Sequence, residues 1–70
     1  MMIKTAAPRC WELTKDNHTV RFEERGPRMT ISNFCTNANG RYGLHSQWWT
    51  MRADARHEWK RLESRGYRRV

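Results

Sequence analysis

Hydrophobic and polar residues alternate along most of the chain between Cys10 and Trp49. A period of two is the pattern of strands that bury one face. Three pairs of turn-forming residues, Asp16-Asn17, Gly26-Pro27 and Asn39-Gly40, divide this region into CWELTK, TVRFEER, RMTISNFC and YGLHSQWW. The pattern therefore predicts four short strands joined by three tight turns.

Two-residue turns at these places fix which residues of neighbouring strands face each other. They place Phe22 opposite Ile31, and Cys35 opposite Leu44. One apolar face then results, formed by Trp11, Leu13, Val20, Phe22, Met29, Ile31, Cys35, Leu44 and Trp48. The sequence predicts a four-stranded antiparallel meander in which this face is buried.

A helix is expected after the fourth strand, because MRADARHEWKRLESR contains neither Gly nor Pro before Gly66. Thr50 is the expected N-cap, and Gly66 the left-handed residue that ends the helix, with Tyr67 folding back on Leu62. Ala55, Trp59 and Leu62 form an apolar stripe that Met51 extends, suited to cover the sheet. The predicted fold class is α+β, of order ββββα, with a flexible lead-in over residues 1–8 and one domain over residues 9–70.

Adjacent side chains on a strand point to opposite faces, so Trp48 is expected beneath the helix and Trp49 in solvent. In the predicted register Trp49 lies opposite Thr30, and His45 opposite Phe34. The chain carries 14 Lys and Arg against seven Asp and Glu, a formal charge of +7, which indicates nucleic acid or another acidic partner. The expected binding residues are the aromatic and basic side chains of the uncovered sheet face and its surroundings: Trp49, Phe34, His45, Arg21, Arg25, Arg28, Arg41, Arg52, Arg56 and Lys60.

Two functions fit this pattern. Aromatic side chains on a sheet stack unpaired bases while arginines hold phosphates, which favours binding of single-stranded nucleic acid. Trp and Arg are also frequent hot-spot residues of protein interfaces. The alternative is an adaptor or inhibitor that docks on an acidic protein surface, or a homodimer formed through Trp49 and Phe34.

Other functions find little support in the sequence. No nucleophile motif, phosphate loop or dinucleotide-binding motif occurs, and a short chain with a flat face predicts no enzyme and no cofactor. Cys10, Cys35 and the three histidines lack metal-ligand spacing, so no metal is expected. The absence of an apolar leader or a long apolar segment, together with only two cysteines, predicts a cytoplasmic protein without a membrane role.

The order of elements resembles one repeat of the purine-rich-element-binding and whirly families, which bind single strands on sheet faces. This resemblance covers about residues 9–66 and implies an α+β module that binds nucleic acid. The segment MRADARHEWKRLESRGYRRV looks like the endings of short uncharacterised proteins from cyanobacteria and their phages. That second resemblance implies a cytoplasmic accessory protein whose partner is a host protein complex.

Overall fold

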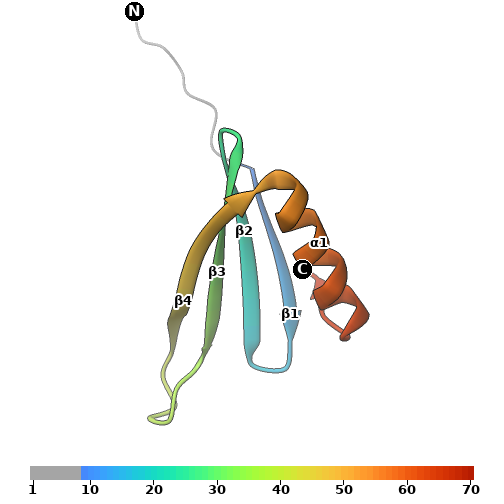
Figure 1. Cartoon of the computed structure of the whole chain (residues 1–70). Coiled ribbons are helices and arrows are strands. Elements are labelled where there is room, and N and C mark those ends of the chain that lie inside the picture. The colour runs from blue at the N-terminus through green and yellow to red at the C-terminus, as the bar shows by residue number, and fades with distance from the viewer. Residues whose placement is uncertain (1–8) are drawn as a thin grey trace, which may run out of the picture.

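A computed structural model describes residues 9–70 (Figure 1). One antiparallel sheet has the strand order β4-β3-β2-β1-β5, and helix α1 packs on one of its faces. The elements are β1 (Cys10–Lys15), β2 (His18–Arg25), β3 (Arg28–Thr36), β4 (Tyr42–Met51), α1 (Arg52–Ser64) and β5 (Arg68–Arg69). The predicted meander followed by a helix is confirmed, with the short β5 as an addition. The lead-in predicted for residues 1–8 lies outside the described residues.

The first two hairpins form as their turn residues predict. Two-residue loops join β1 to β2 and β2 to β3, and each begins with a left-handed residue, Asp16 at φ 55° and Gly26 at φ 62°. Leu13 pairs with Val20, and Phe22 pairs with Ile31. Because both loops have the predicted length, the alternation of apolar and polar side chains is kept across β1, β2 and β3.

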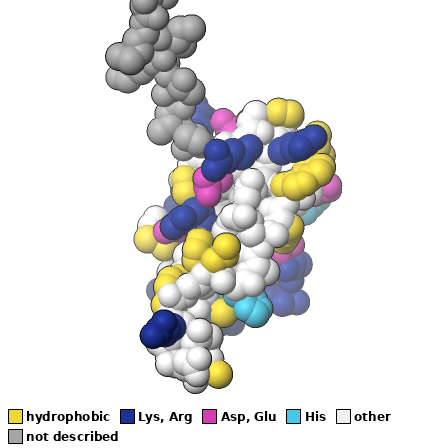
Figure 2. All heavy atoms as spheres, turned by 90° about the vertical axis from the view of Figure 1, so that its left-hand side faces the viewer, with side chains coloured by type: hydrophobic (Ala, Val, Ile, Leu, Met, Phe, Trp, Pro, Cys, Tyr) yellow, Lys and Arg dark blue, Asp and Glu magenta, His cyan; other side chains and the backbone are white. Residues whose placement is uncertain are grey.

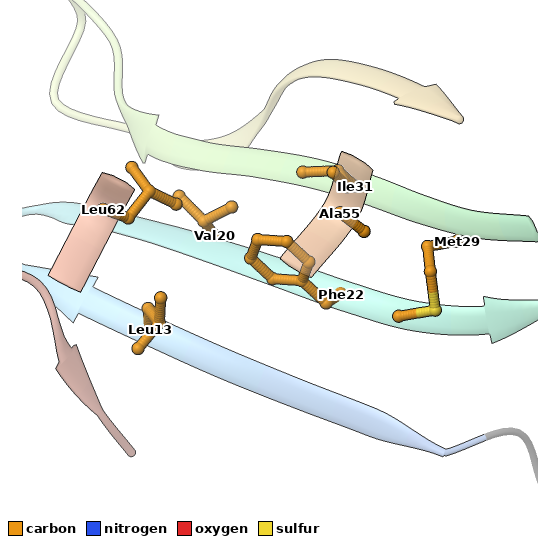
Figure 3. Packing of buried hydrophobic residues seen from close by; sticks show 7 residues of the cluster. All are labelled: Leu13, Val20, Phe22, Met29, Ile31, Ala55 and Leu62. Atoms are coloured by element: carbon orange, nitrogen blue, oxygen red, sulfur yellow. The ribbon is translucent and has the colours of Figure 1, made fainter. Parts of the chain in front are cut away.

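The core consists of seven buried side chains from three strands and the helix: Leu13, Val20, Phe22, Met29, Ile31, Ala55 and Leu62. Leu62 lies toward Val20 and Leu13, whereas Ala55 lies toward Phe22 (Figure 3). Burial of each large apolar side chain contributes about 1.5–3 kcal/mol. The ring of Phe22 also meets Trp59 edge-to-face, with ring centroids 5.1 Å apart. This small cluster holds α1 on the sheet.

The connection between β3 and β4 differs from the prediction. It is a loop of five residues, 37–41, rather than a two-residue turn at Asn39-Gly40. The Asn37 side-chain carbonyl accepts hydrogen bonds from the backbone N–H groups of Asn39 and Arg41, at 2.9 and 3.0 Å, and these bonds close the wider loop. An odd loop length shifts the pairing by one residue at the start of β4.

A β-bulge then restores the predicted register. Phe34 pairs with Leu44, whereas Asn33 pairs with Ser46, so that His45 is an extra residue on β4. Beyond the bulge Ile31 pairs with Trp48 and Thr30 with Trp49, as predicted. Three predictions near the loop are therefore wrong. Leu44 does not face Cys35, His45 does not oppose Phe34, and Leu44 does not join the core.

Trp48 is a further correction to the predicted core. Its side of the sheet is the one that α1 covers, but 39% of the residue is exposed. The core residues of the sheet come from β1, β2 and β3, while β4 lies at the sheet edge farthest from β1 (Figure 1). A helix of 13 residues with one narrow apolar stripe covers the centre of this sheet and leaves Trp48 only half-buried.

Both ends of the helix are well defined. The strand pairing of β4 continues to Met51, which has an extended backbone and is the N-cap without a side-chain cap bond, so the prediction of Thr50 as N-cap is wrong. At the other end Gly66 has φ 98°, and the N–H of Tyr67 donates to the carbonyl oxygen of Leu62 at 3.1 Å. The N–H of Gly66 donates to the carbonyl oxygen of Glu63 at 3.0 Å, and the two bonds are those of the predicted Schellman motif. They turn the chain so that β5 pairs with Leu13 and Thr14 of β1.

Candidate ligand-binding face of the sheet

The face of the sheet turned away from α1 is called the open face below. Its residues follow from the strand pairing. Two paired residues point to the same face of the sheet, and along one strand every second residue points to that face. Thr30 pairs with Trp49, and Arg28 pairs with both Met51 and Arg25. The aromatic, aliphatic and arginine side chains on the open face are Arg21, Arg25, Arg28, Phe34, Tyr42, Leu44, Trp49 and Met51.

Trp49 is the most exposed aromatic residue described, with 58% of its surface accessible. The guanidinium carbon of Arg28 lies 4.2 Å from the centroid of its ring. Arg28 forms no ion pair with any described residue. The unneutralised cation therefore lies over the Trp49 ring at one end of the open face, and this pair is suited to an anionic ligand with a planar group.

A second aromatic group lies at the other end of the same face. Phe34 and Tyr42 stack with ring centroids 6.3 Å apart and an interplanar angle of 16°. The guanidinium carbon of Arg21 lies 4.8 Å from the centroid of the Phe34 ring. The Nε of Arg21 donates to Glu12 at 2.8 Å, and this hydrogen bond raises the pKa of the guanidinium. Arg21 thus keeps its charge but shares it with a carboxylate.

Polar side chains lie between the two aromatic groups. Gln47 donates from Nε2 to the Oγ of buried Ser32 at 2.8 Å, which satisfies both side chains. On β3 the two groups are four residues apart, at Thr30 and Phe34, or about 13 Å along a strand. Two planar groups of a ligand can therefore be held on one surface without touching each other.

Three arginines and two glutamates set the charge of the open face. Arg25 pairs with Glu23 at 3.0 Å, and Arg21 pairs with Glu12 at 2.8 Å. Only Arg28 remains without a carboxylate among the described ion pairs of this face. The positive charge available to a ligand is therefore concentrated beside Trp49.

The remaining predicted site residues lie away from the open face. Arg52 and Arg56 line a groove between α1 and the sheet, on the side opposite to the open face, and Lys60 lies on the same helix. Arg41 ends the β3–β4 loop, and His45 lines a small hollow with Arg41 and Cys35. The helix covers the other face of the sheet, and of its basic residues Arg52 also donates to the carbonyl oxygen of Gly26, in the turn between β2 and β3, at 3.3 Å.

The sequence pattern did not predict that Tyr42 and Leu44 belong to the open face. In an uninterrupted ladder both would lie on the helix side, but the five-residue loop moves them to the open face. Asn37 is the sequence signal that could have revealed this, because Asn at the start of a loop often binds its own following backbone N–H groups.

Several features bear on other kinds of site. Among residues 9–70 there is no group of three or more His, Cys, Asp and Glu side chains placed to hold a metal ion, and both cysteines are free. No helix described is long and apolar enough to cross a membrane. Partial burial of the Cys10 thiol, with the nearby carboxylates of Glu23 and Glu12, raises its pKa against the opposing effect of Arg21.

Sheet, helix and open face together define a small α+β protein with a basic, aromatic surface. Comparison of the chain with family models, with curated proteins and with solved structures gave no match. The resemblances to the purine-rich-element-binding and whirly families, and to short cyanobacterial and phage proteins, therefore stay predictions.

Proposed function

We propose that this protein binds single-stranded nucleic acid on the open face of its sheet. The observation that carries the proposal is the exposed Trp49 ring under the guanidinium of Arg28, which forms no ion pair among residues 9–70. Stacking of one base on an aromatic side chain contributes about 1–3 kcal/mol, and any of the bases can supply the planar group. The cation beside the ring attracts the phosphate that accompanies the base.

The second aromatic group extends the same binding surface. Phe34, Tyr42 and Leu44 offer a planar, apolar area at the other end, and Arg21 of the neighbouring strand lies over the Phe34 ring. Since base stacking and phosphate contacts do not read base edges, we expect binding with little sequence preference. In this proposal the protein acts by binding and catalyses no reaction.

A fluorescence titration tests the proposal. Labelled oligo(dT) and oligo(U) are titrated with protein at about 50 and about 200 mM salt, where phosphate contacts give a log–log slope of about −0.7 per phosphate neutralised. We expect binding to both strands that weakens with salt, and weaker binding to duplex DNA, whose bases are already stacked. Failure to bind either oligonucleotide at the lower salt concentration would refute the proposal.

A specific observation favours a second candidate, a protein-docking surface on β4. This strand lies at the sheet edge, and residues 42–51 contain no Lys, Arg, Asp or Glu although 30% of the chain is charged. Figure 2 looks at this side of the molecule and shows hydrophobic side chains along it. Tyr42, Leu44, Trp49 and Met51 are each at least half exposed. Free strand edges accept an additional strand from a partner or from a second copy.

Light scattering and nuclease treatment separate the two candidates. A stable dimer of twice the 8.5 kDa chain mass would show that β4 serves self-association. A partner captured from a lysate that stays bound after nuclease treatment would be a protein. A monomer whose captured partner is lost with the nuclease supports nucleic-acid binding.

A further inference from the structure

A groove of about 400 Å³ lies between α1 and the sheet, on the side away from the open face. Phe22, Met29 and Ala55 contribute core atoms to its lining, and Trp11 and Trp59 are half-buried beside them. Small-molecule sites are typically concave, largely apolar and about 300–1,000 Å³ in volume. This groove has the size of a small-molecule site.

Arginine side chains surround this groove. Arg9, Arg52, Arg56 and Arg69 line it, together with a single acidic residue, Glu24. Glu24 forms an ion pair with Arg52 at 2.7 Å. The other three arginines form no ion pair within the part of the chain that the structure describes. The groove therefore holds an excess of positive charge, which selects an anionic ligand.

Arg9 and the helix arginines are carried by ordered backbone. The carbonyl oxygen of Arg9 accepts a hydrogen bond from the N–H of Glu24 at 2.8 Å, which ties Arg9 to β2. Arg56 lies in the second turn of α1, whose first residue is Arg52, and the N-terminal end of this helix has no side-chain cap. The unpaired N–H groups and the helix dipole add to the positive potential at this end of the groove.

The aromatic side chains of the groove indicate what the ligand carries besides its anionic group. The guanidinium carbon of Arg69 lies 5.6 Å from the centroid of the Trp59 ring, and Trp11 belongs to the neighbouring strand. Indole and guanidinium planes are the surfaces on which a planar heterocycle stacks. A guanidinium group often donates two parallel hydrogen bonds to the oxygens of one phosphate.

We infer that this groove binds a nucleoside monophosphate, with its phosphate on Arg9 and Arg56 and its base against Trp11 and Trp59. The site is separate from the open face, so it does not rest on the proposed binding of single strands. Its ligand is a small molecule because the groove is bounded by the helix on one side and by the sheet on the other, whereas the open face has no such wall.

The test is an NMR titration with 5′-AMP that follows the four indole N–H signals of the protein. We expect the signals of Trp11 and Trp59 to move and that of Trp49, on the open face, to stay in place. Adenosine and inorganic phosphate are titrated in parallel and should each bind at least about tenfold more weakly, since each lacks half of the recognised groups.

Two variants of equal charge change supply the control. Arg56→Gln should weaken binding of 5′-AMP at least about tenfold, a loss of about 1.4 kcal/mol. Lys60→Gln removes a charge one turn further along α1, outside the groove lining, and should leave the affinity unchanged. Both residues are exposed, so circular dichroism should show the same fold for both variants.

Several results would overturn the inference. These are the absence of 5′-AMP binding, equal affinities for inorganic phosphate and 5′-AMP, equal effects of the two variants, or movement of the Trp49 signal alone. Binding of a poly-glutamate peptide without binding of 5′-AMP would identify an acidic-peptide site instead and would also overturn it. Arg28→Gln, which belongs to the open face, should not affect 5′-AMP, so failure of the groove and failure of the open face are distinguishable.

Discussion

The guanidinium carbon of Arg28 lies 4.2 Å from the centre of the Trp49 ring, and the two residues come from neighbouring strands. Arg28 pairs with Met51 and Trp49 pairs with Thr30, so the contact runs diagonally across the β3–β4 ladder. At an exposed site such a cation–π contact contributes about 0.5–1 kcal/mol. Its larger consequence is to orient the ring and to place a positive charge beside it before any ligand arrives.

Replacement of Trp49 tests this surface directly. Because Trp49 is 58% exposed and outside the core, Trp49→Ala should lower the free energy of unfolding by only about 1 kcal/mol, mainly through loss of the contact with Arg28. It should weaken oligonucleotide binding by about 1–3 kcal/mol through loss of base stacking. Denaturant unfolding and fluorescence anisotropy measure the two quantities. Trp49→Phe keeps a ring and should lose less affinity; equal losses for Ala and Phe would argue against stacking.

Arg28 should act through charge, and its effect should appear in the salt dependence. Arg28→Gln removes one phosphate contact, so the magnitude of the log–log slope for single strands should fall by about 0.7. Arg61→Gln is the matched control, since Arg61 is on α1 and already pairs with Glu58. Affinities measured at several salt concentrations give both slopes. A slope equally reduced in the two variants would mean that binding responds to net charge and not to this site.

Most of the sheet could be predicted from the turn residues and from the alternation of side chains between the two faces of a strand. Two-residue loops at Asp16-Asn17 and Gly26-Pro27 have the expected length, and the Schellman bonds at Gly66 end the helix where expected. The opposite orientation of Trp48 and Trp49 was also predicted correctly. It survived a wrong loop length only because the bulge at His45 adds the residue that compensates for it.

The parts of the site that could not be predicted depend on distances between elements. The alternation of side chains along β4 places Trp48 on the helix side. It does not determine how far a 13-residue helix reaches across a sheet, and Trp48 is 39% exposed. The sequence likewise predicted Arg52 and Arg56 among the binding residues of the uncovered sheet face and its surroundings. They line the opposite groove instead, because α1 turns back over the other face.

Gly66 should be required for its backbone conformation. At φ 98° an L-residue is strained, and the nearest atoms to an added Cβ are Lys15 side-chain carbons and nitrogen at 3.7–3.9 Å, which is ordinary contact. We therefore expect Gly66→Ala to cost about 1 kcal/mol or more through the backbone alone. Gly43→Ala is the control, since an added Cβ there meets nothing within 4 Å and the backbone is not left-handed. Equal stabilities of the two variants in urea would show that the cap contributes nothing.

The reactivity of the Cys10 thiol should depend on the charged side chains near it, on β1 and β2. Partial burial is the largest cause of its raised pKa, and Glu23 adds to it while Arg21 opposes it. A raised pKa means a smaller thiolate fraction at any pH below it, so alkylation by iodoacetamide at about pH 8 should be slower in the folded protein than in denaturant. Mass spectrometry of the peptide that carries Cys10 gives the rate. Glu23→Gln removes a negative charge and should speed the reaction, whereas Arg21→Gln should slow it. Rates that are insensitive to both changes would show that these side chains do not influence the thiol.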